Sequence, residues 1–221
     1  MFNYYSITIL GAVIIGLVWT RRRFIACNIS RNDFENLILI CTPLTVIGAR
    51  LFHVITDWSV YRNGQLSIWA IWNGGLGFYG GLVLGMLGAV MYCRWKNISL
   101  LTFIDAIYLP LIGTMVLGRW ANIFNQELLP YAFFELFFNW LLGIIFGVVE
   151  FISAKQSVTG IGLIAFTFVF LDRFFLEFIR LEPRVVFSLL TVNQIISLIM
   201  SSICAILWLY ISKNQDRKSV V

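Results

Sequence analysis

Charge is scarce in this chain, and its scarcity excludes most classes of soluble protein. Of 221 residues only 12% are charged, whereas 60% are hydrophobic. A soluble domain cannot bury so large an apolar share, and the hydrophobic stretches approach the length that crosses a bilayer. The net charge of +5 does not indicate nucleic-acid binding, because the basic residues lie at the ends of apolar runs or singly inside them and form no basic face.

Residues that bind metals or form disulfides are also sparse. The chain has one histidine, His53, and four cysteines without CxxC or CxH spacing. A metal cluster, a zinc site or a disulfide framework is therefore not predicted. Internal repeats and low-complexity tracts are lacking as well. We expect one compact helical domain over residues 1–212, followed by a short polar cytoplasmic tail over 213–221.

Long apolar segments, by contrast, are plentiful. Crossing a hydrocarbon layer of ~30 Å takes about 20 apolar residues in a helix. The predicted fold class is therefore all-α, a polytopic membrane protein with about seven transmembrane helices. The predicted spans are approximately residues 4–20, 35–56, 74–93, 100–123, 131–152, 160–179 and 190–212.

Lysine and arginine are unevenly divided between the two sides of these spans. Most follow the first, third, fifth and seventh spans, whereas the opposite loops carry only Arg62 and Arg184, with Arg180 at a span end. The positive-inside rule then predicts an outward N-terminus and a cytoplasmic C-terminus. The first span is not a typical cleavable signal peptide, because its arginines follow the apolar run.

Three arginines, Arg50, Arg119 and Arg173, fall inside or at the ends of predicted spans. An arginine in a membrane helix costs about 2.5–3.5 kcal/mol on insertion scales, so it is usually kept for a reason. Pairing with an acidic residue is a sufficient structural reason for one arginine. Three at similar depth near the outer side favour a polar cavity. The acidic candidates are Asp105, Glu127, Glu135, Asp172 and Glu177.

The spacing around two of these arginines indicates an anion site. Arg119 and Asn122 stand at i and i+3, on one helix face, and Arg173, Glu177 and Arg180 stand at i, i+4 and i+7 on another. Guanidinium groups bind phosphate oxygens through planar, charge-assisted hydrogen bonds. Neighbouring amides suit glycerol hydroxyls or carbonyls, as in a phospholipid. Composition alone leaves open whether such a lipid is substrate, ligand or passenger.

Residues 72–81 contain five glycines at the start of the third predicted span. Such density permits an unwound turn, which at membrane depth usually lines a cavity, or a close approach between helices. Tyr79 lies among these glycines. Its hydroxyl is placed either to meet a substrate or to anchor the chain at the membrane interface.

Taken in order from about residue 48 to 197, these motifs resemble those of the prolipoprotein diacylglyceryl transferase family, seven-span bacterial membrane enzymes. The order of the motifs is more specific than any single match. The matching segments are Gly48-Ala49-Arg50, Gly74-Gly75 with Tyr79-Gly80-Gly81, Gly118-Arg119 with Asn122 and Asn125-Gln126-Glu127, Arg173 with Glu177-Phe178 and Arg180, and Asn193-Gln194-Ile195-Ile196-Ser197.

The resemblance implies a reaction and a location. The family transfers diacylglyceryl from phosphatidylglycerol to the lipobox cysteine thiol of a prolipoprotein, which forms a thioether and releases glycerol phosphate. The implied partners are phosphatidylglycerol, a prolipoprotein signal peptide with its lipobox cysteine, and membrane lipids. The implied location is the bacterial plasma membrane, crossed several times. No metal and no soluble cofactor is implied.

The resemblance also implies roles for individual residues. Arg119 and Arg173 are expected to support the leaving phosphate electrostatically. Tyr79 stands where some relatives carry histidine, and is expected to take the thiol proton or to position the lipid. We therefore expect Arg119, Tyr79 and Arg173 to be catalytic. The expected substrate-binding residues are Arg50, Asn122, Asn125, Glu127, Glu135, Glu177 and Arg180.

The match is incomplete around the fifth and sixth spans. The family's His-Pro-x-x-x-Tyr-Glu motif keeps only Pro130 and Glu135, and a family tyrosine upstream of Arg173 is Val169. The chain resembles a short, divergent member that lacks most of the outer head domain. Two alternatives stay open: an inactive or repurposed phospholipid-binding member of the fold, and a small membrane transporter, which would be expected to show repeated halves.

Overall fold

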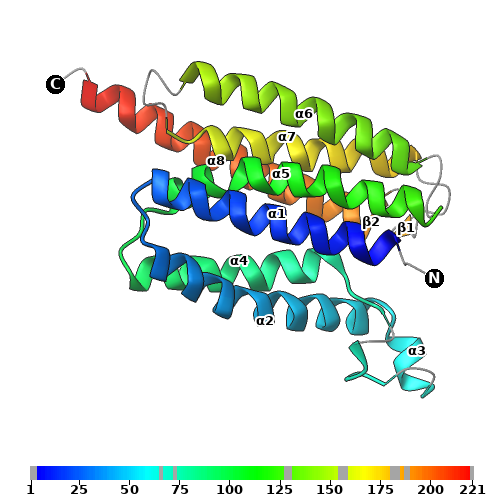
Figure 1. The fold of residues 1–221 in the computed structure, drawn as a ribbon. Helices are drawn as coiled ribbons and strands as arrows, with labels where there is room; N and C mark the ends of the chain where they lie inside the picture. Colours follow the sequence, from blue (N-terminus) through cyan, green and yellow to red (C-terminus); the bar gives the residue numbers. More distant parts are fainter. Residues whose placement is uncertain are drawn as a thin grey trace. The chain divides into compact units, whose positions relative to one another are not determined.

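The computed structural model describes residues 4–64, 67–71, 74–126, 131–153, 159–179, 185–186 and 190–219, the side chains of 185–186 and 214–219 excepted. These residues are almost entirely helical (Figure 1). The elements are α1 (Tyr4–Ala26), α2 (Arg31–Thr56), α3 (Trp58–Arg62), α4 (Phe78–Trp95), α5 (Leu100–Phe124), α6 (Tyr131–Ser153), α7 (Ile161–Leu176), the 3₁₀ turn η2 (Glu177–Ile179), β1 (Val185–Val186), β2 (Leu190–Thr191) and α8 (Val192–Ser219).

The predicted all-α architecture is confirmed, and a helix lies at each predicted span. Among the described residues, five helical segments are long and apolar enough to cross a membrane: α1, α2, α5, α6 and residues Val192–Lys213 of α8. Helix α4 has 18 residues and α7 has 16, and neither is among the five. The count of seven spans and the orientation of the termini stay predictions.

The ends of several helices differ from the predicted spans for identifiable reasons. Helix α1 continues to Ala26 instead of ending near residue 20, because arginine is a good helix former. Helix α2 begins at Arg31, four residues early, since the Ser30 side chain accepts a hydrogen bond from the Asp33 backbone N–H at 3.1 Å. Helix α4 begins only at Phe78, after a non-helical segment that contains the glycines at 74 and 75.

The helices form two compact units. The first comprises α1, α5, α6, α7 and α8 with the short antiparallel β1–β2 ladder, and the second comprises α2, α3 and α4. The prediction of a single domain over 1–212 stays a prediction. The expected polar tail after residue 212 begins as a continuation of α8, which extends to Ser219.

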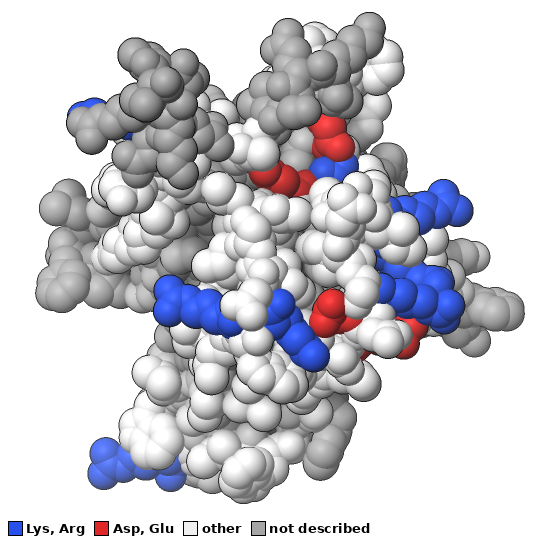
Figure 2. Space-filling view, turned by 90° about the vertical axis from the view of Figure 1, so that its left-hand side faces the viewer, with Lys and Arg blue, Asp and Glu red and all other residues white. Residues whose placement is uncertain are grey.

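Exposed basic side chains lie at or near the helix ends that the positive-inside rule used. Arg22 is exposed near the end of α1, Arg31 at the start of α2, Arg94 in the last turn of α4, and Lys213 in α8. Figure 2 shows Lys and Arg side chains across the middle of the face it presents and at its edges. Long, exposed basic side chains of this kind reach the polar membrane interface readily.

In the second unit, glycines bring α2 and α4 into backbone contact. A Cβ added at Gly48 would collide with the carbonyl oxygen of Gly80, and one added at Gly80 would collide with that of Gly48. Farther along the same contact, Gly88 faces Leu44. This arrangement of small residues facing each other is how membrane helices pack closely. Close helix approach and a non-helical turn, the two options left open for this glycine-rich stretch, thus both occur.

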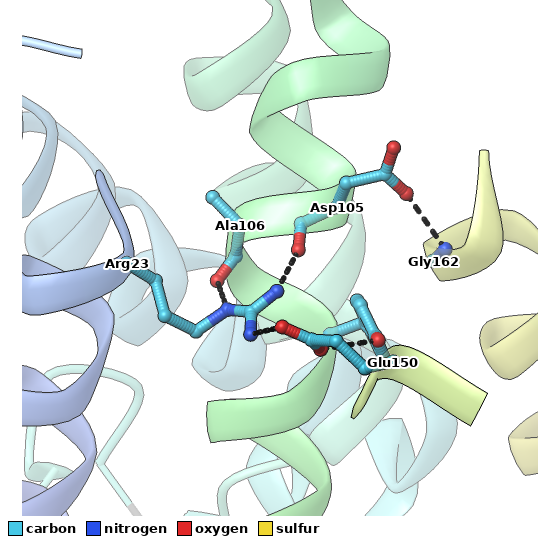
Figure 3. A network of polar contacts seen from close by, with 6 residues as sticks. Arg23, Asp105, Ala106, Glu150 and Gly162 are labelled. Carbon is cyan, nitrogen blue, oxygen red and sulfur yellow. Dashed lines mark hydrogen bonds and ion pairs between the residues drawn. The ribbon is translucent and has the colours of Figure 1, made fainter. Parts of the chain in front are cut away.

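In the first unit, Arg23 joins three helices through a polar network (Figure 3). Pro110 has no backbone N–H, so the carbonyl four residues earlier, that of Ala106, lacks its usual helical donor. Arg23 Nε donates to that oxygen at 2.9 Å, and the same guanidinium forms an ion pair with Glu150 of α6. The sequence showed Arg23 only as one of the basic residues that set orientation.

Asp105 of α5 joins this network to the start of α7. Its carboxylate accepts the backbone N–H groups of Gly160 and Gly162, each at 2.7 Å. These donors lie at the N-terminus of α7, where backbone N–H groups lack helical partners and a negative charge is favoured. Asp105 was among the acidic candidates for pairing with an intramembrane arginine. These two hydrogen bonds make its carboxylate a cap at the start of α7.

Gly48→Ala is expected to lower the free energy of unfolding by about 1–3 kcal/mol, because the added methyl group overpacks the α2–α4 contact. Thermal unfolding of the purified protein in detergent would measure this loss. Gly11→Ala is the matched control, since a Cβ there meets nothing within 4 Å. Equal unfolding midpoints for the two variants would contradict the packing described for Gly48.

Candidate functional site

A buried carboxylate, that of Glu135 on α6, organises a charged cluster in the first unit. Glu135 is 0% exposed. Arg119 of α5 places its Nε 2.7 Å from Glu135 Oε2, and its Nη2 donates to Oε1 at 2.8 Å. Arg173 of α7 pairs with Oε1 through its Nη1. Glu135 thus binds two guanidinium groups, and the three residues come from three different helices.

The cluster joins two guanidinium groups to one carboxylate. Arg119 and Arg173 both pair with Glu135. The side chains of Arg119 and Arg173 each keep 17% of their surface exposed, so an anion has access to them. Asp172, next to Arg173 on α7, lies within electrostatic range of all three residues, and its Oδ2 is buried without a hydrogen-bond partner among the described residues.

Of four other predicted site residues of this unit, two lie on or just after α5 and two are not described. Asn122 is half-buried, one turn beyond Arg119 on α5. Asn125 follows the end of α5, is exposed, and donates its backbone N–H to Ala121 O at 3.1 Å. Glu127 and Arg180 lie outside the described residues.

Glu177 connects the end of α7 to the start of α8. Its carboxylate is buried and accepts a hydrogen bond from Asn193 Nδ2 at 3.0 Å. Thr191 and Gln194 cap α8 reciprocally: Gln194 N donates to Thr191 Oγ1 at 3.1 Å, and Thr191 N donates to Gln194 Oε1 at 2.8 Å. The predicted Asn193-Gln194 motif therefore contributes to the helix start that holds Glu177.

Arg50 of the second unit is fully occupied by backbone oxygens. A guanidinium group has five N–H donors, and all five of them here donate to carbonyl groups of residues 67–75. The guanidinium also lies 5.2 Å from the centre of the Tyr61 ring. Arg50 thereby holds a non-helical loop. The accepting residues are Ser67 (2.7 Å), Ile68 (2.9 Å), Ala70 (3.2 Å), Gly74 (2.6 Å) and Gly75 (3.0 Å).

Tyr79 follows this loop in the first turn of α4. Gly77 N donates to Ala49 O at 2.8 Å, which fixes the chain just before the tyrosine. Gly75 has φ +73°, and a Cβ there would crowd Arg50 and His53. Tyr79 is 6% exposed. A glycine is thus required at position 75, in the turn that leads to Tyr79.

The model of the family described as prolipoprotein diacylglyceryl transferase matches residues 1–131, more than half of the chain. That segment includes Arg50, Tyr79 and Arg119. The chain belongs to the prolipoprotein diacylglyceryl transferase family. Together with the five apolar helices, this membership makes the chain a multi-pass protein of the bacterial cell membrane.

Several curated relatives are named phosphatidylglycerol–prolipoprotein diacylglyceryl transferase. The protein from Streptococcus suis (strain 05ZYH33) is 37% identical over 125 residues, which are 57% of this chain and 47% of the relative. The one from Streptococcus equi subsp. zooepidemicus (strain MGCS10565) is 33% identical over 57% of this chain and 48% of its own. The chain thus spans about half the length of these relatives.

Another relative matches a larger share of the chain than the family model does. The relative from Lactobacillus acidophilus (strain ATCC 700396 / NCK56 / N2 / NCFM), which has the same name, is 27% identical over 212 residues, 81% of this chain and 75% of its own. The family model ends before Glu135 and Arg173. These two residues are instead tied to Arg119 by the ion pairs of the structure.

His53 and Asn139 were not predicted from the sequence as site residues. His53 places Nδ1 2.8 Å from the Tyr61 hydroxyl and Nε2 3.6 Å from Asp57 Oδ2, and the i, i+4 spacing of His53 and Asp57 is a signal that was available. Asn139 is a buried amide on α6, one turn after Glu135. The roles assigned to Arg119, Tyr79, Arg173 and the substrate-binding residues stay predictions.

Glu135→Gln is expected to destabilise the protein by about 3–5 kcal/mol, because removing one partner leaves buried guanidinium charges uncompensated. Glu35→Gln is the matched control. Glu35 pairs with Arg31 at 2.8 Å, but the two side chains are 52% and 64% exposed, and such pairs contribute about 0–1 kcal/mol. Thermal unfolding in detergent would compare the two. Similar losses of unfolding free energy in both variants would contradict the role of Glu135 as the buried partner of two arginines.

Proposed function

We propose that this chain transfers the diacylglyceryl group of phosphatidylglycerol to the lipobox cysteine thiol of a prolipoprotein. The observation that carries the proposal is the pairing of Arg119 and Arg173 with the single carboxylate of Glu135, inside a member of this family. Two guanidinium groups that are held in place and partly exposed suit a phosphate that becomes more negative as it leaves.

The reaction makes one bond and breaks one. The cysteine sulfur attacks the glycerol carbon that carries the phosphate ester, a carbon–sulfur bond forms, and the bond from that carbon to the phosphate oxygen breaks. Its electron pair leaves with glycerol phosphate. Arg119 and Arg173 stabilise this developing charge, and Glu135 holds both guanidinium groups in place before the reaction begins, so little reorganisation is needed.

The thiol must lose its proton, since the thiolate is the nucleophile. Tyr79 is our candidate either for accepting that proton or for positioning the lipid, on the strength of its place in the family motif. The loop before it is held by the five hydrogen bonds of Arg50. We therefore assign Arg50 a positioning role, which acts on the substrate through the loop that leads to Tyr79.

The remaining site residues have supporting roles in this proposal. Asn122 and Asn125 are candidates for binding glycerol hydroxyls, and Glu127 and Arg180 belong to the same family motifs. Glu177 supports the site by tying the end of α7 to the start of α8. The partners are phosphatidylglycerol and the prolipoprotein signal peptide, within the membrane.

A second candidate function is phospholipid binding without transfer. The specific observation in its favour is the loss of two family residues just before Glu135, where the histidine and tyrosine positions hold Leu129 and Phe134. Phe134 is 43% exposed and makes no contribution to the ion pairs of Glu135. Under this candidate function, the protein binds a phospholipid at the anion site but does not transfer its diacylglyceryl group.

Transport receives less support from the structure. Glu135 and Glu150 stand about 22 Å apart along α6, enough to place them near opposite sides of the hydrocarbon layer. Between them, Gly143 packs against Ile112, and Phe146 is buried. Among the described residues of this unit, apolar side chains thus interrupt the polar groups along the buried face of α6.

Arg119→Gln and Arg173→Gln are each expected to lower the transfer rate by about 10²–10³-fold, because each removes a donor to the leaving phosphate. The assay follows labelled diacylglyceryl from phosphatidylglycerol onto a lipobox peptide in reconstituted membranes. Arg22→Gln, at an exposed position near the end of α1, should keep full activity.

The outcome separates the candidates. Thioether formation by the parent protein and its loss in both arginine variants support the transferase. No thioether, under conditions in which a known family member is active, removes that function. If phosphatidylglycerol still binds in that case and Arg119→Gln weakens binding, the second candidate holds.

A further inference from the structure

Asn139 is a buried polar side chain whose amide has no hydrogen-bond partner in the described part of the chain. It is 1% exposed on α6, and neither Oδ1 nor Nδ2 has a hydrogen-bond partner among the described residues. Buried amides are satisfied in the great majority of native structures, and an unsatisfied one calls for a ligand or a bound water. The helix backbone does not account for this residue, because Asn is a poor helix former with no apolar contribution to the core.

The position of Asn139 relates it to the charged cluster. It follows Glu135 by four residues, so the two side chains lie on one face of α6, separated by about 6 Å along the axis. Both belong to the buried stripe of that helix. Beyond Asn139 the stripe becomes apolar, with Gly143 against Ile112 and then Phe146. Asn139 is therefore the last polar group between the guanidinium cluster and the apolar interior.

The order of groups along this stripe matches the order of groups in a glycerophospholipid. Glu135 with its two paired arginines of α5 and α7 comes first, then one amide, then apolar side chains. In the lipid the phosphate comes first, then the ester carbonyls of the glycerol backbone, then the acyl chains. An amide NH₂ is a hydrogen-bond donor, and an ester carbonyl accepts but cannot donate. A phosphate held by Arg119 and Arg173 would bring the ester groups to the depth of Asn139.

We propose that Asn139 recognises the ester linkage of the lipid, by donating a hydrogen bond from Nδ2 to an acyl ester carbonyl. The proposal rests on the proposed lipid site at Arg119 and Arg173. It makes Asn139 a specificity-determining residue that favours diacyl over dialkyl glycerophospholipids. Dialkyl lipids have ether links and lack the carbonyl oxygen, so they leave the amide unsatisfied.

The test combines a change in the protein with a change in the lipid. Affinities of the purified protein in detergent are measured for diacyl phosphatidylglycerol and for its dialkyl ether analogue. The parent protein should bind the diacyl lipid about five- to tenfold more tightly, the factor expected for one neutral hydrogen bond in a buried site. Asn139→Leu, of similar volume, should lose that preference by weakening diacyl binding while ether-lipid binding stays unchanged.

Asn32→Leu is the control, because Asn32 is exposed near the start of α2 and should keep the full preference. An equal diacyl-to-ether ratio in the parent and Asn139→Leu overturns the proposal. So does a parallel loss of both affinities in Asn139→Leu, since that is the signature of a merely structural amide or of one satisfied by water.

The binding readout also separates this proposal from the proposed transfer. If the protein forms no thioether but Asn139→Leu still abolishes the ester preference, the recognition of the ester stands and the transferase function fails. If thioether forms and the diacyl-to-ether ratio is the same in both proteins, the transferase stands and the role of Asn139 fails. In an active protein, Asn139→Leu should raise KM for the diacyl lipid about five- to tenfold with little change in kcat.

Discussion

A charged side chain inside a membrane needs partners there, and Glu135 is a partner to two arginines at once. Unpaired, each arginine would cost about 2.5–3.5 kcal/mol on insertion scales. Bound to the one buried carboxylate, Arg119 and Arg173 fix α5, α6 and α7 with respect to one another. The same pairing holds two partly exposed guanidinium groups at one carboxylate, so a single interaction supports the fold and suits the anion site that we propose.

The second unit meets the same requirement in a different way. Non-helical backbone at membrane depth exposes carbonyl groups that need donors, and it is tolerated where those donors exist. Arg50 supplies five of them to carbonyl groups in residues 67–71 and 74–75. Two arginines of similar sequence context thus differ in their contacts: Arg119 pairs with a carboxylate, whereas Arg50 holds a loop that leads into α4 and Tyr79.

Sequence reasoning predicted the helices because apolar length is a local property, and it found Arg119 and Arg173 because an intramembrane charge is conspicuous in one segment. Pairing of arginine with Glu135 was considered, but the convergence of two arginines on it depends on how α5, α6 and α7 face one another. The oxygens that accept from Arg50, and the Asn139 amide that has no partner among the described residues, depend on contacts of the same kind. Only a structure provides such contacts.

The central claim is that Glu135 makes Arg119 and Arg173 act as one anion site. A double-mutant cycle on phosphatidylglycerol affinity tests it most directly, with Arg119→Gln, Arg173→Gln and their combination in the parent and in a Glu135→Gln background. The account predicts strong non-additivity in the parent, because either substitution dismantles the shared site, and small effects of both arginines without Glu135. Additive losses that are equal in the two backgrounds would contradict it.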